Sequence, residues 1–251
     1  MQCPSCQNMV PDNSATCPTC GWGFRSGGGA VARTIVRAAA RPKLPVEVEF
    51  AADIDRTGSS LGFKTGIERS MEIVVRSIVA KACKVTVWVV SHGDLDLDEQ
   101  PVVHTAAGTP DQAIADVKGI TFSGGGDAEE HHLDGIEYAF TTTPWTLNPR
   151  KARGALIAFL TDDTKPLRSG KSARQLGEEI RSRGILVYLV CQETPTLREF
   201  AEAAGGMIFA ISNTPSADEL AKVSAQVAAS ITATVGAGST VPLSVTASSS
   251  V

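Results

Sequence analysis

The chain has 251 residues, of which 43% are hydrophobic and 20% charged, and a formal net charge of -4. This composition is typical of a soluble globular protein with one good-sized core and a small appendage, and it gives no general reason to expect nucleic-acid binding. No apolar run approaches the roughly 20 residues of a transmembrane helix. The N-terminus has neither the basic nor the apolar segment of a secretory signal, so we expect a cytoplasmic protein.

Four of the six cysteines form two Cys-x-x-Cys pairs at the N-terminus, Cys3 with Cys6 and Cys17 with Cys20, separated by ten residues. Four thiolates at this spacing are typical of a structural zinc ribbon, which we place at residues 1–24. Redox-active pairs or disulfides are the alternatives, but no thioredoxin-like strand and helix surround either pair. In so short a segment Zn²⁺ would supply most of the folding free energy.

Residues 25–45 contain five basic side chains and no acidic one. Arg33, Arg37 and Arg41 are spaced by four residues, so they would share one face of a short helix that Pro42 ends. This basic linker is either a solvated tether or a docking surface for an acidic partner or nucleic acid.

From Val46 onward, short apolar runs alternate with amphipathic segments. The runs at residues 84–90, 155–160, 185–190 and 207–211 predict strands buried on both faces of a mostly parallel sheet. Thr109, Ser172 and Ser216 have the spacing of helix N-caps, and Gly184 and Gly205 lie where C-caps belong. We therefore predict a doubly wound α/β domain over residues 46–235, followed by a loosely ordered tail over residues 236–251.

Oxygen-bearing side chains follow three of the predicted strand ends. They are Asp55, Thr57 and Ser59; the segment 123–127, which ends in Asp127; and the segment 161–163. Ligands of open α/β sheets bind beyond the carboxyl ends of the strands, and hard oxygen donors suit magnesium, manganese or calcium. The sequence therefore predicts a divalent cation site at this edge.

Asp55-x-Thr57-x-Ser59 resembles the first motif, Asp-x-Ser-x-Ser, of the metal-ion-dependent adhesion site (MIDAS) of von Willebrand factor A (vWA) domains. Thr161-Asp162-Asp163 resembles the Thr-Asp-Gly that closes their fourth strand. The resemblance covers residues 46–235 and implies a Rossmann-like vWA domain in which Asp55, Thr57, Ser59 and Asp162 bind magnesium directly or through water.

The second vWA motif usually ends in a metal-binding threonine, and Gly126 has that place here. The neighbouring Asp127 is either a substitute ligand or, with Glu130, a helix-capping pair. His131 and His132 follow, and we expect both to face solvent. Residues 94–99 are rich in acidic side chains but lack the glycine and glutamate of a calcium loop, so we predict an acidic surface loop there.

Asp53-x-Asp55-x-Thr57 also matches the nucleophile motif of haloacid-dehalogenase-type phosphatases. Asp53 would then be the nucleophile and Asp55 the general acid/base. That family places a lysine before its later acidic pair, whereas the lysines near Asp162 and Asp163 follow it. Asp53 and Asp55 lie on the same side of their strand, so the pattern does not decide which of them belongs to the site.

The vWA resemblance implies a non-enzymatic scaffold or regulatory adaptor, similar to bacterial cytosolic vWA proteins of the tellurium-resistance type, which often work beside a kinase, phosphatase or ATPase. An acidic residue of a protein partner would fill the open position on the cation. We expect no membrane partner. For the zinc ribbon we favour protein contacts over nucleic acid, because no basic residue lies between Cys3 and Cys20.

Overall fold

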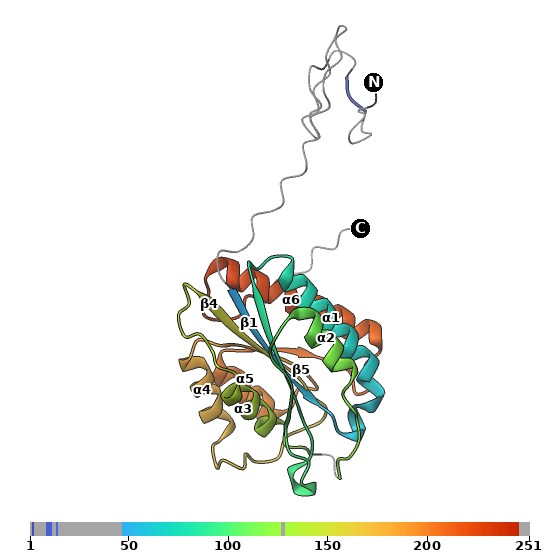
Figure 1. Ribbon diagram of the computed structural model, residues 1–251, viewed down its shortest axis with the longest axis vertical. Coiled ribbons are helices and arrows are strands. Elements are labelled where there is room, and N and C mark those ends of the chain that lie inside the picture. Colours follow the sequence, from blue (N-terminus) through green and yellow to red (C-terminus); the bar gives the residue numbers. More distant parts are fainter. Residues whose placement is uncertain (1, 3–8, 12–13, 15–46, 127–128, 246–251) are drawn as a thin grey trace. The chain divides into compact units, whose positions relative to one another are not determined.

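The computed structural model, drawn in Figure 1, describes residues 2, 9–11, 14, 47–126 and 129–245. The chain divides into two units, residues 1–40 and 41–251. In the first unit, an antiparallel bridge joins Gln2 and Met9. The four cysteines of the predicted zinc ribbon and the basic residues of the linker lie outside the described residues, so both features stay predictions. No described helix combines the length and the hydropathy that a bilayer-spanning segment needs.

The second unit is built on a single mixed sheet. Its strands lie in the order β3-β2-β1-β4-β5-β6, and β3 alone runs antiparallel to its neighbour. Their bounds are β1 Glu47–Asp55, β2 Val85–His92, β3 Val102–Gly108, β4 Ala152–Phe159, β5 Leu186–Cys191 and β6 Met207–Ala210. This arrangement confirms the predicted doubly wound α/β fold.

Helices cover both faces of the sheet (Figure 1). Helices α1 (Lys64–Val79), α2 (Pro110–Lys118) and α6 (Ala217–Ala237) pack on one face, and α3 (His132–Thr142), α4 (Ala173–Ser182) and α5 (Pro195–Ala204) pack on the other. Phe50, Ala52 and Ile54 of β1 enter the first core and Ala51 enters the second. Because side chains alternate along a strand, Asp53 and Asp55 share the face of Ala51 and are directed toward α3.

Most predicted helix ends are confirmed. Ser172 and Gln175 form a complete capping box, the Thr109 and Ser216 side chains cap α2 and α6, and Gly205 ends α5 with a φ of 60°. Helix α3 differs, because it begins at His132 without a side-chain cap. Glu130 instead forms a parallel bridge with Thr164. Its predicted role in a capping box was therefore wrong, since the chain is still extended at that residue.

The segment after α6 is held against that helix over part of its length. The Leu243 carbonyl oxygen accepts a hydrogen bond from Ser230 Oγ at 2.7 Å, and the Leu243 N–H donates to Thr234 Oγ1 at 2.8 Å. This part of the predicted loose tail is therefore ordered by contacts with α6.

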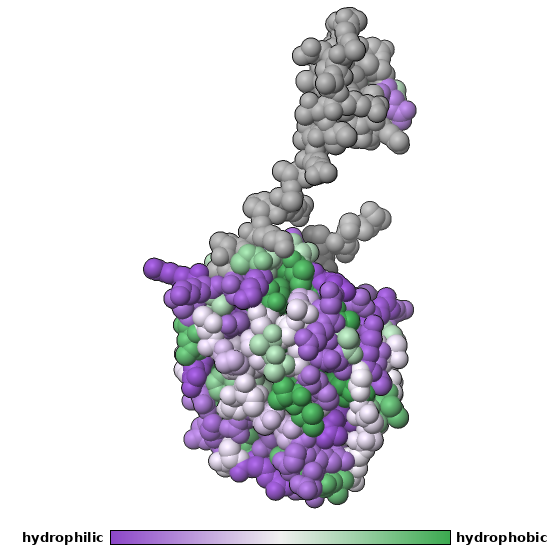
Figure 2. All heavy atoms as spheres, in the orientation of Figure 1, coloured by the Kyte–Doolittle hydropathy of each residue, from purple (hydrophilic) through white to green (hydrophobic). Residues whose placement is uncertain are grey.

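The face of the domain seen in Figure 2 is largely polar, with apolar residues in small patches.

The packing of α4 on α5 can be tested at Gly177. A Cβ at this position would lie 2.6 Å from the Phe200 carbonyl oxygen and 2.8 Å from the Ala204 nitrogen. Gly177→Ala should lower the free energy of unfolding by about 1–3 kcal/mol, because the backbone of α5 cannot yield as a side chain can. Urea unfolding measures the change.

Gly62→Ala is the matched control, since nothing lies within 4 Å of its Cβ position. It should change the free energy of unfolding by less than about 0.5 kcal/mol. Equal stability of Gly177→Ala and the unaltered protein would contradict this close approach of α4 and α5.

Candidate metal centre

The candidate centre lies where β1 ends. Asp55 is the last residue of β1, and its Oδ1 accepts a hydrogen bond at 2.9 Å from the N–H of Thr57, two residues on. An aspartate that bonds the backbone in this way favours a turn over a continued strand. The chain then forms the short 3-10 helix η1 (Gly58–Phe63), which brings the next hydroxyl groups back toward Asp55.

Three hydroxyl groups donate to the buried Asp55 carboxylate. Thr57 Oγ1 lies 2.7 Å from Oδ1, while Ser60 Oγ and Thr161 Oγ1 lie 2.7 and 2.6 Å from Oδ2. Ser59 Oγ completes the group at 2.8 Å from Thr57 Oγ1 and 3.2 Å from Thr161 Oγ1. Segments more than 100 residues apart therefore meet at one carboxylate.

The chemistry of these donors fits a small divalent cation. Hydroxyls that give their protons to Asp55 keep their oxygen lone pairs for an ion. Neighbouring oxygens around Mg²⁺ lie about 3 Å apart, because each is about 2.1 Å from the ion at near right angles. The Thr57–Ser59 separation matches that spacing, and Ser59 is exposed to solvent. Thr57 and Ser59 are thus the residues best placed to hold a cation.

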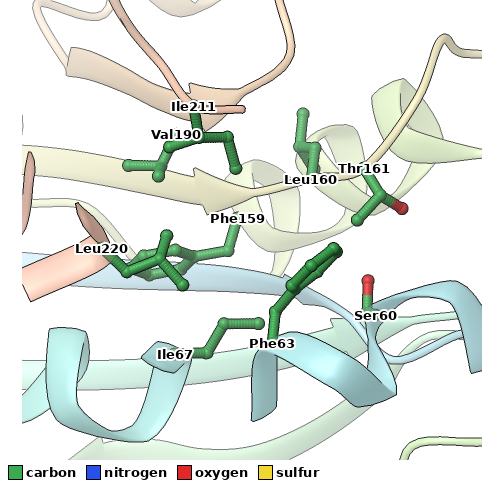
Figure 3. Close-up of a pocket in the computed structure, with 9 residues that line it drawn as sticks. All are labelled: Ser60, Phe63, Ile67, Phe159, Leu160, Thr161, Val190, Ile211 and Leu220. Carbon is green, nitrogen blue, oxygen red and sulfur yellow. The ribbon is translucent and has the colours of Figure 1, made fainter. Parts of the chain in front are cut away.

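Apolar side chains close the centre from the interior. Ser60 and Thr161 lie at one end of a small pocket that continues between Phe63, Phe159 and Leu220 (Figure 3). The hydroxyl groups therefore stand between an apolar floor and the exposed Ser59. Ser60 and Thr161 were not among the predicted ligands, although Thr161 lies in the oxygen-donor segment 161–163 that the sequence placed at this edge.

Of the two remaining predicted ligands, Asp162 and Asp127, the structure describes only Asp162. Asp162 follows Thr161, is half-buried and has a φ of 48°, which is uncommon for a residue other than glycine. Strained backbone of this kind concentrates at functional sites. Asp127 lies outside the described residues, so its role stays a prediction.

Behind the hydroxyl groups lies a buried chain of histidines. His92 Nδ1 lies 2.9 Å from Asp53 Oδ1, and His92 Nε2 lies 2.9 Å from His132 Nδ1. His132 Nε2 bonds the carbonyl oxygen of Thr161. This chain links β1, β2 and α3 to the residue whose hydroxyl donates to Asp55.

The expectation that His131 and His132 face solvent was wrong, since both are buried. His132 is one helical turn before Ile136 and so belongs to the apolar face of α3 that packs on the sheet. Gly135 allows the close approach, because a Cβ there would lie 2.3 Å from His92 Nδ1. The spacing from His132 to Ile136 was the sequence signal for this burial.

The hydrogen-bond partners determine where the protons lie. The Thr161 carbonyl can only accept, so His132 Nε2 carries a proton and its Nδ1 accepts from His92. His92 then donates from both nitrogens, to His132 and to the Asp53 carboxylate. Burial alone would lower the pKa of His92, but Asp53 first, and then Asp55 and Glu130, raise it. His92 is therefore the charged member of the chain.

The same environment sets the charges of Asp55 and His132. Burial by itself would raise the pKa of Asp55, but His132, His92 and the hydroxyl hydrogen bonds outweigh it and lower the pKa to about 2. Burial lowers the pKa of His132 to about 4. At neutral pH the centre thus contains an ionised Asp55 beside a neutral His132.

A second group of ionisable side chains lies next to the centre. Asp94, Asp96 and His131 bring ligand atoms within 4.8 Å of one another. Lys165 Nζ already lies 3.0 Å from Asp94 and 2.8 Å from Asp96, and Arg168 also pairs with Asp96. Lysine and arginine thus occupy the place that a metal ion would need. Asp94 is 1% exposed, so the predicted acidic surface loop was wrong for this residue.

Asp53, the nucleophile of the phosphatase interpretation, faces the interior. Its side chain is 0% exposed, and its Oδ1 is bound to His92. A Cβ on Gly135 would lie 2.9 Å from its Oδ2, so α3 covers the carboxylate directly. Asp55, which shares its face of the strand, is the carboxylate that meets the hydroxyl groups.

The charge assignment predicts a stability change with pH. In the unfolded chain His132 binds a proton with its ordinary pKa of 6.5, whereas in the fold its pKa is about 4. Between these values the unfolded state binds more protons at His132, so this residue makes the fold less stable as the pH is lowered from 6.5 to 4. The contribution of His132 approaches about 3 kcal/mol.

Long-range ¹H–¹⁵N NMR spectra of the histidines test the protonation states from which this change in stability follows. At pH 6 His132 should be neutral with its proton on Nε2, and His92 should be protonated on both nitrogens. His104, which is half-buried on β3, serves as the internal reference. A charged His132 at pH 6 would contradict the proposed direction of the hydrogen-bond chain.

The architecture is similar to that of solved vWA domains. The crystal structure of the SpRpn10 VWA domain aligns with a TM-score of 0.54 and 13% identity, over 71% of this chain and 93% of that one. Proximal thread matrix protein 1 (PTMP1) from the mussel byssus, solved with a zinc occupied MIDAS motif, gives 0.56 and 15%, over 74% and 46%. The sequence matches no family model and no curated protein. The chain therefore contains a domain with the vWA fold.

Proposed function

We propose that this protein is a metal-dependent protein-interaction module. Thr57 and Ser59, with Asp55 and Asp162 directly or through water, would hold Mg²⁺ or another divalent cation, and an acidic residue of a partner would complete its coordination. The observation that carries the proposal is the gathering of hydroxyl groups around a buried, ionised Asp55 at the carboxyl edge of a vWA fold. The zinc occupied MIDAS motif of the similar PTMP1 structure supports it.

The physical reason for an acidic partner is incomplete neutralisation. Hydroxyl oxygens carry no net charge, so a shell rich in them leaves a divalent cation with positive charge and open positions. A partner carboxylate would neutralise the remaining charge and fill an open coordination position, and this interaction is strong in a partly dry interface. Two exposed leucines adjoin the centre: Leu61 in η1 and Leu97, whose Cδ1 would contact a Cβ on Gly126 at 3.2 Å. They would add apolar contacts around the metal-bound carboxylate.

The finer parts of the proposal concern its cellular role. The resemblance to vWA proteins implies a scaffold or regulatory adaptor. It would act in the cytoplasm beside a kinase, phosphatase or ATPase. We propose that the domain is not an enzyme. The buried position of Asp53 supports this, because a phosphoryl-accepting carboxylate must reach its substrate.

Metal binding can be measured by isothermal titration of the purified protein with Mn²⁺ and Mg²⁺. Ser59→Ala should weaken the affinity at least about tenfold, because even the loss of outer-shell groups has effects of that size. Ser182→Ala is the control, since that exposed hydroxyl donates to the Glu179 carbonyl within α4. Wild-type affinity in Ser59→Ala would refute this site.

Partner capture then tests the interaction itself. EDTA and Ser59→Ala should each reduce recovery of a bound protein, and equal recovery in all samples would exclude a metal bridge. The same preparations, incubated with Mg²⁺ and a phosphate ester, test the enzyme alternative. Turnover that is abolished by Asp53→Asn but survives Ser59→Ala would favour the phosphatase.

The N-terminal zinc ribbon is a separate proposal, supported by the spacing of Cys3, Cys6, Cys17 and Cys20. The full-length protein should contain one tightly bound zinc ion by elemental analysis, and Cys6→Ser should lose it. Cys83→Ser is the control, since that exposed cysteine is outside the motif. Zinc retained by Cys6→Ser would disprove the ribbon.

A further inference from the structure

A buried carboxylate that was not among the predicted ligands lies beside the candidate metal centre. Glu130 is 2% exposed. Its N–H donates to the Asp163 carbonyl at 3.3 Å, and its own carbonyl accepts from the Lys165 N–H at 2.8 Å. These bonds hold the Glu130 backbone to the loop after β4, which carries Thr161 and Asp162.

The side chain of Glu130 reaches Gly125, which also lies against Thr57. A Cβ built on Gly125 would lie 2.6 Å from Glu130 Oε1 and 3.1 Å from Thr57 Cβ, so both side chains border the same face of this glycine. The glycine segment is itself fixed to η1, because the Gly58 N–H donates to the Gly124 carbonyl at 3.0 Å. Glu130 therefore reaches the point where the loops after β1 and β4 meet the glycine segment.

The position accounts for a gap in the motif. The second vWA motif usually supplies a threonine to the metal, and Gly126 has no side chain to offer. Gly125 has a φ of 75°, a left-handed conformation that favours glycine, and its lack of a side chain leaves room for the Glu130 carboxyl group. A carboxylate oxygen from this direction would stand in for the missing hydroxyl.

We propose that Glu130 is a further carboxylate of the metal centre, which binds the cation directly or through one water from the side of Gly125. The inference rests on the proposed function, since it assigns a residue to the same site. A divalent cation beside Thr57 would attract this buried carboxylate electrostatically. A carboxylate in place of a hydroxyl also neutralises the ion more fully, so the centre holds its metal more tightly.

Calorimetric titration of Mn²⁺ into the full-length protein tests the assignment, with thermal unfolding in Mn²⁺ and in EDTA as a second readout. Glu130→Gln keeps the shape of the side chain and removes its charge. It should weaken Mn²⁺ binding at least about tenfold and reduce the rise in Tm that Mn²⁺ produces. Glu129→Gln is the matched control, because it makes the same charge change at an exposed neighbour and should bind Mn²⁺ normally.

The outcomes separate the two proposals. If the unaltered protein binds Mn²⁺ and Ser59→Ala does not, but Glu130→Gln binds normally, the role of Glu130 is refuted and the proposed function stands. If the unaltered protein binds no Mn²⁺, both are refuted. Should Glu130→Gln fail to fold in EDTA, Glu130→Asp replaces it, since it retracts the carboxylate by one methylene. Weakened Mn²⁺ binding would then support the assignment, and normal binding would overturn it.

Discussion

The buried charge of Asp55 is the constraint on which the centre depends. A carboxylate withdrawn from water stays ionised only if hydrogen-bond donors surround it. Thr57, Ser60 and Thr161 supply those donors from the segments that follow β1 and β4, so the charge draws these segments together. The same hydrogen bonds orient hydroxyl lone pairs away from Asp55, which gives the cavity edge the oxygen donors that a cation requires.

The histidine chain forms a second layer behind this arrangement. Because β1 alternates, Asp53 and Asp55 both face α3, and α3 meets them with His132 in place of an apolar residue. His132 donates a hydrogen bond to the Thr161 carbonyl, while the Thr161 hydroxyl donates one to Asp55. The position of one hydroxyl group is thus set by contacts from two strands and a helix. Gly135 makes this possible by leaving space for the ring of His92.

Charge at the neighbouring loop is largely compensated within the protein. The carboxylates of Asp94 and Asp96 pair with Lys165 and Arg168, which come from the loop after β4. Glu99 accepts hydrogen bonds from the Asp94 and Gly125 N–H groups. The acidic segment 94–99 is therefore joined by ion pairs to the loop after β4. Both lie beside the place where a partner would bind.

The sequence alone determined the features that rest on short-range patterns. Apolar runs placed β2, β4, β5 and β6, capping residues such as Ser172 placed helix ends, and Asp55, Thr57 and Ser59 are neighbours because they lie on one turn. Tertiary structure decided the surroundings of His132, Glu130 and Lys165. Their partners lie on other segments of the chain, and a buried polar residue has the same local pattern as an exposed one. Only packing, which removes water and brings distant partners within hydrogen-bond reach, distinguishes the two.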